Sequence, residues 1–151
     1  MTVQDLALKL NGDLLNEYKH MLFYLHAANT VQGPERLWLK PWLDGQTEEE
    51  LGHVRQFAHK IASLGVTPAT PLQGVPDYPV NLMDSYSVIS YAMLMEQEVV
   101  DNYHERRKEA ESLYNETGRH YDLVVLLEEQ IEHSQGDIDE LRLMLGRPRQ
   151  S

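Results

Sequence analysis

Four long segments of the chain repeat apolar residues at intervals of three and four positions, which is the spacing of one helix face. The pattern predicts four helices, which run from Val3 to about Thr30, from Pro34 or Glu35 to Leu64, from Asn81 or Asp84 to about Asn115, and from about Arg119 to Leu145. No segment alternates apolar and polar residues in the way that a strand requires. The sequence therefore predicts an all-α fold.

The connections between these segments predict how the helices are arranged. Gly33-Pro34 breaks the chain after the first helix, and Thr117-Gly118 makes a short turn before the fourth. Residues 65–80 contain four prolines, which excludes a helix there, and they are numerous enough to cross from one end of a bundle to the other. Short, long and short connections predict an antiparallel four-helix bundle with one long crossover. We expect one domain over residues 1–146 and a short, solvated C-terminal tail over residues 147–151.

Three of the predicted helices carry a carboxylate in the middle of their apolar face. These residues are Glu17, Glu50 and Glu96, and His53 follows Glu50 by one helical turn. An unpaired ionised carboxylate in a protein core costs several kcal/mol. A bound metal ion offsets that cost for all three residues. The Glu50-x-x-His53 spacing also places both side chains on one face of a helix, where they can reach the same ion.

Composition narrows the kind of site and of partner. The chain has no cysteine, which excludes disulfides and thiolate ligands, so a metal must be held by Glu, Asp, His or Tyr. Such ligands point to iron, manganese or zinc. The net charge of −11 argues against nucleic-acid binding. No apolar run reaches the roughly 20 residues that cross a bilayer, and the N-terminus does not look like a signal peptide. We therefore expect a cytoplasmic protein that binds no membrane.

The order of these motifs resembles a known family. The motifs are Asn16-Glu17, Tyr24-Leu25-His26-Ala27, Glu50-Leu51-Gly52-His53, Gly65 with Pro68, Glu96, and His133, which follows Glu96 by 37 residues. Together they are similar to the ferritin-like superfamily, and in particular to bacterioferritins and Dps-like ferritins. The resemblance implies that Glu17 and Glu96 are terminal ligands of two metals, that Glu50 bridges them and that His53 binds the first. It also implies that Tyr24 forms hydrogen bonds near the reacting centre, so Glu50 and Tyr24 are the expected catalytic residues.

The fourth helix departs from the family pattern. The family carries a second Glu-x-x-His there, but alignment on His133 places Gln130 at the position of the glutamate. Glu129 shares a helix face with His133 and is one replacement, so both are predicted metal ligands. A local π-bulge that re-aims Glu132 is another.

A shifted register of the fourth helix is the remaining alternative. The apolar face would then consist of Leu127, Ile131, Ser134, Ile138 and Leu141. That register places Ser134 at the centre and makes Asp137, one turn later, a possible ligand in place of His133.

Other positions bear on cofactors and assembly. Bacterioferritins bind haem through a methionine that would directly follow Glu50, and the chain has Leu51 there, so no haem is expected. The chain ends soon after the fourth helix, which favours a dodecamer, a dimer or another small homo-oligomer over a larger shell. His20 forms a further Glu-x-x-His with Glu17. The family needs no histidine at that position, so we expect packing or solvent to satisfy it.

The resemblance implies an iron-binding protein that oxidises Fe(II) with dioxygen or peroxide, for iron storage or detoxification. The site would hold one or two iron ions, and manganese is possible. Two alternatives remain open. One is another iron or manganese oxidase or peroxide-scavenging enzyme on the same fold, and the other is an assembly module that has lost its metal. The departure at Gln130 supports the second alternative.

Overall fold

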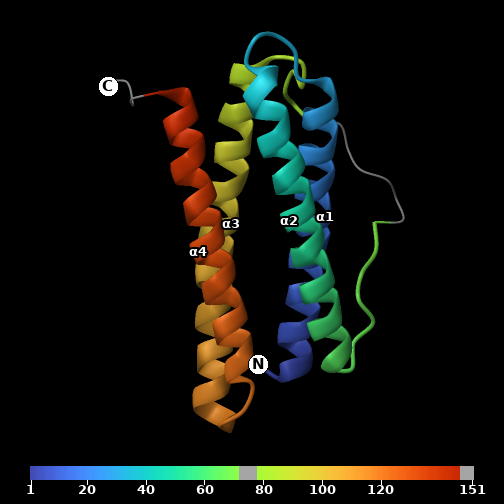
Figure 1. Ribbon diagram of the computed structural model, residues 1–151. Helices are drawn as coiled ribbons and strands as arrows, with labels where there is room; N and C mark the ends of the chain where they lie inside the picture. The colour runs from blue at the N-terminus through green and yellow to red at the C-terminus, as the bar shows by residue number, and fades with distance from the viewer. Residues whose placement is uncertain (72–77, 147–151) are drawn as a thin grey trace. The chain divides into compact units, whose positions relative to one another are not determined.

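The computed structural model describes residues 1–71 and 78–146. Within these residues the chain forms four helices and no strand, namely α1 (Val3–Thr30), α2 (Arg36–Ser63), α3 (Ser85–Thr117) and α4 (Tyr121–Leu145) (Figure 1). The all-α prediction is confirmed, and the predicted C-terminal tail lies outside the described residues. The helices form two compact units, one of residues up to Val88 and one from Ile89 onward. Among the described residues, no helix combines the length and the apolar character that crossing a bilayer would demand.

The first unit is built on the hairpin of α1 and α2, which run side by side in opposite directions (Figure 1). Gly33 makes the turn with a φ of +96°, a left-handed conformation that glycine adopts without steric cost. Arg36 Nη1 then donates to the Val31 carbonyl at 2.7 Å, which satisfies a carbonyl left open at the end of α1. Pro41 lies inside α2 and does not interrupt the helix.

The described parts of the long connection are tied to α1. The Asn11 side chain donates to the Thr67 carbonyl at 3.0 Å and accepts from the Ala69 amide at 2.8 Å. Farther along, the Tyr78 hydroxyl donates to the Lys19 carbonyl at 2.8 Å. Thr30 Oγ1 donates to the Leu82 carbonyl at 3.0 Å. The connection thus covers α1 through specific hydrogen bonds.

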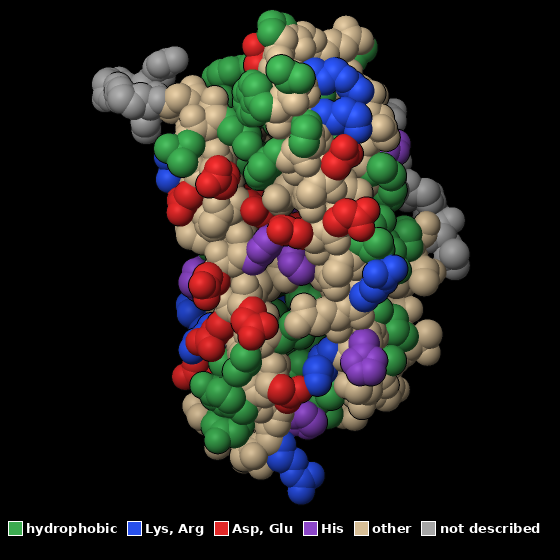
Figure 2. Space-filling model, viewed as in Figure 1, with side chains coloured by type: hydrophobic (Ala, Val, Ile, Leu, Met, Phe, Trp, Pro, Cys, Tyr) green, Lys and Arg blue, Asp and Glu red, His purple; other side chains and the backbone are tan. Residues whose placement is uncertain are grey.

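The second unit is built on α3 and α4, which also run antiparallel. Arg107 on α3 pairs with Glu128 on α4 at 2.9 Å, and the Tyr114 and Tyr121 rings meet near the turn with centroids 4.9 Å apart. Gly118 forms the turn with a φ of +70°. Figure 2 shows carboxylates, in red, along the exposed face of α4, and hydrophobic side chains, in green, near the start of α2.

The predicted apolar faces are buried over most of their length. On α1 the face runs through Leu6, Leu10, Leu14, Glu17, Tyr24 and Ala28, and on α2 it runs through Glu50, Val54, Phe57 and Ile61. Phe23 is also buried, whereas Met21 is only partly buried. The buried face of α1 is therefore wider at this point than a single row of residues spaced three and four positions apart.

Candidate metal site

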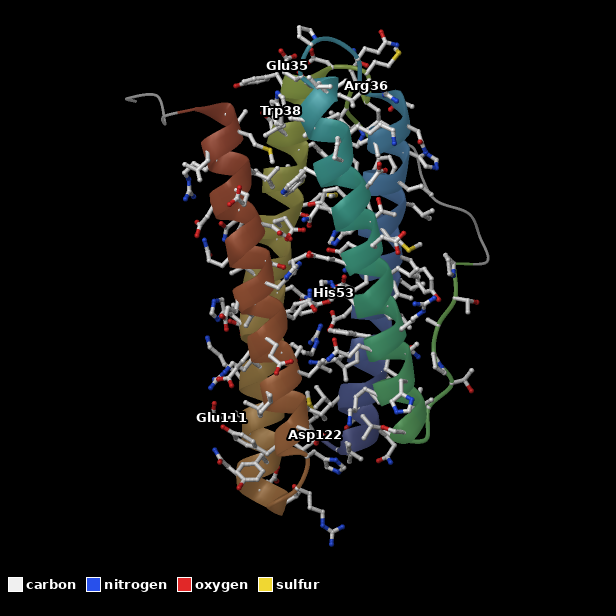
Figure 3. All side chains as sticks on the ribbon, viewed as in Figure 1. Glu35, Arg36, Trp38, His53, Glu111 and Asp122 are labelled. Carbon is white, nitrogen blue, oxygen red and sulfur yellow. The ribbon has the colours of Figure 1, made fainter. Side chains whose placement is uncertain are left out.

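Glu17, Glu50 and His53 come together in the middle of the α1–α2 hairpin. His53 Nδ1 lies 3.4 Å from Glu50 Oε2 and 3.8 Å from Glu17 Oε2. Both carboxylates are almost completely buried, whereas His53 keeps some exposure. Figure 3 labels His53 about midway along α2. The three residues that the sequence assigned to α1 and α2 are therefore brought to one place.

The antiparallel register of the hairpin brings them together. Tyr24 contacts Trp42 with ring centroids 6.1 Å apart, and Glu17 lies close to His53, so residue numbers rise on one helix as they fall on the other. Leu14 flanks Glu17 and Val54 flanks Glu50, and both apolar side chains are buried. Apolar packing on both sides thus holds two carboxylates away from water.

The electrostatics of Glu17 reflect this burial and the groups around it. Burial by itself raises the pKa of a carboxyl because it disfavours the charged form. The interactions of Glu17 with Glu50, His53 and His20 outweigh that effect and lower the pKa of Glu17 to about 2. Glu17 is therefore ionised in a buried position, which is the state in which a carboxylate binds a cation.

The donor atoms fit a divalent metal ion. One ligand atom from each of Glu17, Glu50 and His53 lies within 4.8 Å of the others. Two carboxylates and an imidazole suit Fe(II), Mn(II) and Zn(II), which accept mixed oxygen and nitrogen donors. Three protein ligands also leave coordination positions for a substrate.

Tyr24, the other predicted catalytic residue, is fully buried two turns after Glu17. Its ring packs edge-on against Phe23, with centroids 5.5 Å apart, and against Trp42. These contacts hold the tyrosine rigidly on the same helix face as Glu17.

In the second unit, Glu96 is fully buried on α3, as its place on the predicted apolar face requires. On α4 the buried polar residues are Gln130, Ser134 and Asp137, while Glu129 and Glu132 are exposed. Ser134 and Asp137 are buried, as the shifted register expects, but Ile131 is only partly buried and Gln130, the residue of the unshifted alignment, is buried as well. His133 is partly exposed, and its Nε2 lies 3.3 Å from Asp137 Oδ2. Whether any of these side chains binds a metal remains a prediction.

Two buried polar residues beside the cluster were not assigned to it from the sequence. His20 lies one turn after Glu17, and Gln46 lies one turn before Glu50; each is 6% exposed. Burial lowers the pKa of His20, and the charge of Glu17 opposes the shift. Neither His20 Nδ1 nor Gln46 Oε1 has a hydrogen-bond partner among the described residues. The sequence did contain an indication that both residues lie beside the cluster, because His20 is three positions from Glu17 and Gln46 is four positions from Glu50.

Comparison with known proteins extends these observations. The model of one protein family, described as a ferritin-like domain, matches residues 7–150. No curated protein sequence matches the chain.

Several solved structures are similar over nearly the whole chain. One, described as ferritin-like diiron-carboxylate proteins from Bacillus anthracis str. Ames, is 33% identical, with a TM-score of 0.82 over 95% of this chain and 97% of that one. A dodecameric thioferritin, the bacterioferritin-related protein from Bacteroides fragilis, is 19% identical, with a TM-score of 0.81 over 96% and 86%. A Dps protein from Bacillus brevis is 17% identical, with a TM-score of 0.82 over 94% and 95%. The last two likenesses show the four-helix bundle fold alone.

Proposed function

Because the chain belongs to the ferritin-like family, whose model matches residues 7–150, we propose that it binds Fe(II) at Glu17, Glu50 and His53 and oxidises it. The observation that carries this proposal is the convergence of two buried carboxylates and an imidazole within 4.8 Å. The similar Bacillus anthracis structure, whose description names diiron-carboxylate proteins, supports iron as the metal.

In this proposal iron is the substrate, and dioxygen or peroxide takes its electrons. Each Fe(II) gives up one electron, and each hydrogen peroxide takes up two electrons and two protons and leaves as two waters. Glu17 and Glu50 offset the charge of the ion, and His53 supplies the nitrogen ligand. The net charge of −11 attracts cations toward the protein. The sequence-based assignment of Glu96, Glu129 and His133 as metal ligands stays a prediction, and of these three Glu129 is exposed.

Iron storage or detoxification is the role that suits such an oxidation. The product Fe(III) must be kept out of solution, and a homo-oligomer that encloses a cavity does so. The similar Bacteroides fragilis protein is described as dodecameric, which supports a small closed assembly for this chain.

The direct test removes Glu50. We expect Glu50→Ala to abolish Fe(II) oxidation, measured as Fe(III) absorbance after aerobic addition of Fe(II), while circular dichroism shows unchanged helical content. Glu48→Ala is the matched control, because Glu48 is an exposed glutamate on the same helix. Oxidation at the wild-type rate in Glu50→Ala would contradict the site.

One observation favours a second function. Gln130, at the position where the family pattern has a glutamate, is 3% exposed, and a buried neutral amide is a poor ligand for a hard cation. An assembly module without metal would have that feature. Elemental analysis after Fe(II) loading separates the two functions, since the first predicts about one or two ions per chain.

A further inference from the structure

His20 is a buried histidine without an evident structural role. Its side chain is 94% removed from solvent, and its Nδ1 has no hydrogen-bond partner among the described residues. Leaving such a group unsatisfied destabilises the folded state, so a native protein that keeps one usually has a ligand or a function for it. Phe23 and Leu14 show that this face of α1 accommodates apolar side chains, so packing alone would favour a residue other than histidine.

The position of His20 connects it with the metal cluster. Glu17-x-x-His20 on α1 repeats the spacing of Glu50-x-x-His53 on α2, and Glu17 and His20 interact electrostatically. Residues three apart lie on one face of a helix, so His20 and Glu17 can bind one ion together. Di-metal carboxylate bundles use two Glu-x-x-His motifs. This chain has Gln130 in place of the glutamate of a motif on α4, and it has the additional motif on α1.

Gln46 is suited to support His20. A histidine that binds a metal through one ring nitrogen almost always donates from the other to a hydrogen-bond acceptor. In the antiparallel register, the pairing of Tyr24 with Trp42 and of Glu17 with His53 places Gln46 at the level of His20 along the hairpin. Gln46 Oε1 is buried and has no hydrogen-bond partner among the described residues, so it is available as that acceptor.

We propose that His20 is a metal ligand of the site, supplying an imidazole to the ion held by Glu17, with Gln46 positioning its ring. The inference rests on the proposed function. The ring nitrogens of His20 do not belong to the group of ligand atoms, from Glu17, Glu50 and His53, that lie within 4.8 Å of one another. Binding therefore includes a rotation of the His20 ring toward Glu17, which a side chain makes without any change in the helix.

The experiment uses Co(II), a spectroscopic substitute for Fe(II), and the full chain purified without metal. The variants are His20→Leu, His20→Gln and Glu50→Ala, with His26→Gln as the control because His26 is an exposed histidine on the same helix. For each protein, Co(II) is titrated while its visible absorption is recorded, and melting temperatures are measured with and without the ion.

The ligand role predicts opposite changes in metal-free stability and in metal binding. His20→Leu should melt at the wild-type temperature or higher without metal, because it removes an unsatisfied polar group. Its Kd for Co(II) should rise at least about tenfold and its Co(II) spectrum should change, as expected on losing a metal-site residue. His20→Gln should show the same loss of affinity, which keeps the test valid if the leucine variant does not fold. His26→Gln should behave as the wild type.

Other outcomes separate this inference from the function it rests on. If both His20 variants bind Co(II) with wild-type affinity and spectrum while Glu50→Ala does not bind, His20 is not a ligand and the proposed metal site stands. If the metal-free His20 variants melt at a lower temperature and bind Co(II) normally, the role of His20 is structural and the inference is wrong. If the wild-type chain binds no Co(II), the proposed function itself is wrong.

Discussion

At the scale of single residues, the chemistry of the site depends on holding charge where water is scarce. Glu17 is buried and yet ionised, because its interactions with Glu50 and His53 outweigh the cost of desolvation. A carboxylate in this state is prepared for a cation before the ion arrives.

This electrostatic state predicts a pH dependence. The pKa of Glu17 lies below its ordinary value of 4.5 in the folded state, so its ionisation stabilises the metal-free protein above pH 4.5. That stabilisation is lost as the pH falls from about 4.5 toward 2. Urea unfolding at pH 6 and pH 3 should show a larger loss of stability for wild type than for Glu17→Gln. An equal loss in the two proteins would contradict the assignment.

Tyr24 allows a test of chemistry apart from binding. If its hydroxyl forms hydrogen bonds during the oxidation, Tyr24→Phe should slow Fe(II) oxidation by about tenfold or more, the effect of losing a hydrogen bond to a charged group. The number of Fe(II) ions bound should not change, because no ligand is removed. Tyr18→Phe, on the same helix, is the control. If Tyr24→Phe oxidised Fe(II) at the wild-type rate, Tyr24 would have no role in the oxidation.

At the scale of elements, helix ends are determined by local hydrogen bonds that the apolar pattern does not reveal. Asp84 accepts hydrogen bonds from the Ser87 amide at 2.8 Å and from the Ser87 hydroxyl at 2.7 Å, and α3 begins at the next residue, Ser85. Thr2 and Asp5 form a reciprocal pair at the start of α1 in the same way. The sequence left the start of α3 open between Asn81 and Asp84, and the cap explains why the later position is correct.

The cap of α3 predicts a stability change. Asp84→Ala should lower the free energy of unfolding, because the first-turn amide of Ser87 loses its acceptor. Asp84→Asn keeps an acceptor and should lose much less. The Ser87 hydrogen bonds lower the pKa of Asp84, so the advantage of Asp over Asn should disappear as the pH falls below 3.8. Urea unfolding of wild type, Asp84→Ala and Asp84→Asn at each pH measures these differences in stability. Equal stabilities of the three proteins would show that Asp84 does not cap α3.

At the scale of the whole molecule, the net charge and the exposed apolar side chains bear on the proposed function. The chain carries 24 acidic and 13 basic residues, so its surface field favours cations. Leu37 is 86% exposed and Trp38 is 45% exposed, an unusual position for large apolar side chains at the start of α2. Both features suit a protein that collects metal ions and associates with copies of itself.

The expected homo-oligomer is tested by sedimentation of the purified protein. We expect a particle of several times the mass of one chain at neutral pH. Because the contacts in this expectation are apolar, the particle should persist when the salt concentration is raised from 0.1 to 1 M, whereas screening should slow Fe(II) uptake over the same range. A single monomeric species throughout would contradict the storage role.

The sequence alone determined the helices and predicted a metal site. Apolar spacing marks helix faces, glycine and proline mark their ends, and Glu17, Glu50 and Glu96 stand out because carboxylates are costly in an apolar face. These signals are local, so they can be recognised without knowing which residues are neighbours in the folded chain.

Tertiary structure alone decided which other polar residues are buried. It showed that Ser134 and Asp137, and not Glu129, lie on the buried face of α4, and that His20 and Gln46 are buried without hydrogen-bond partners among the described residues. Burial and pairing depend on residues distant in sequence, which the packing of one helix on another brings together.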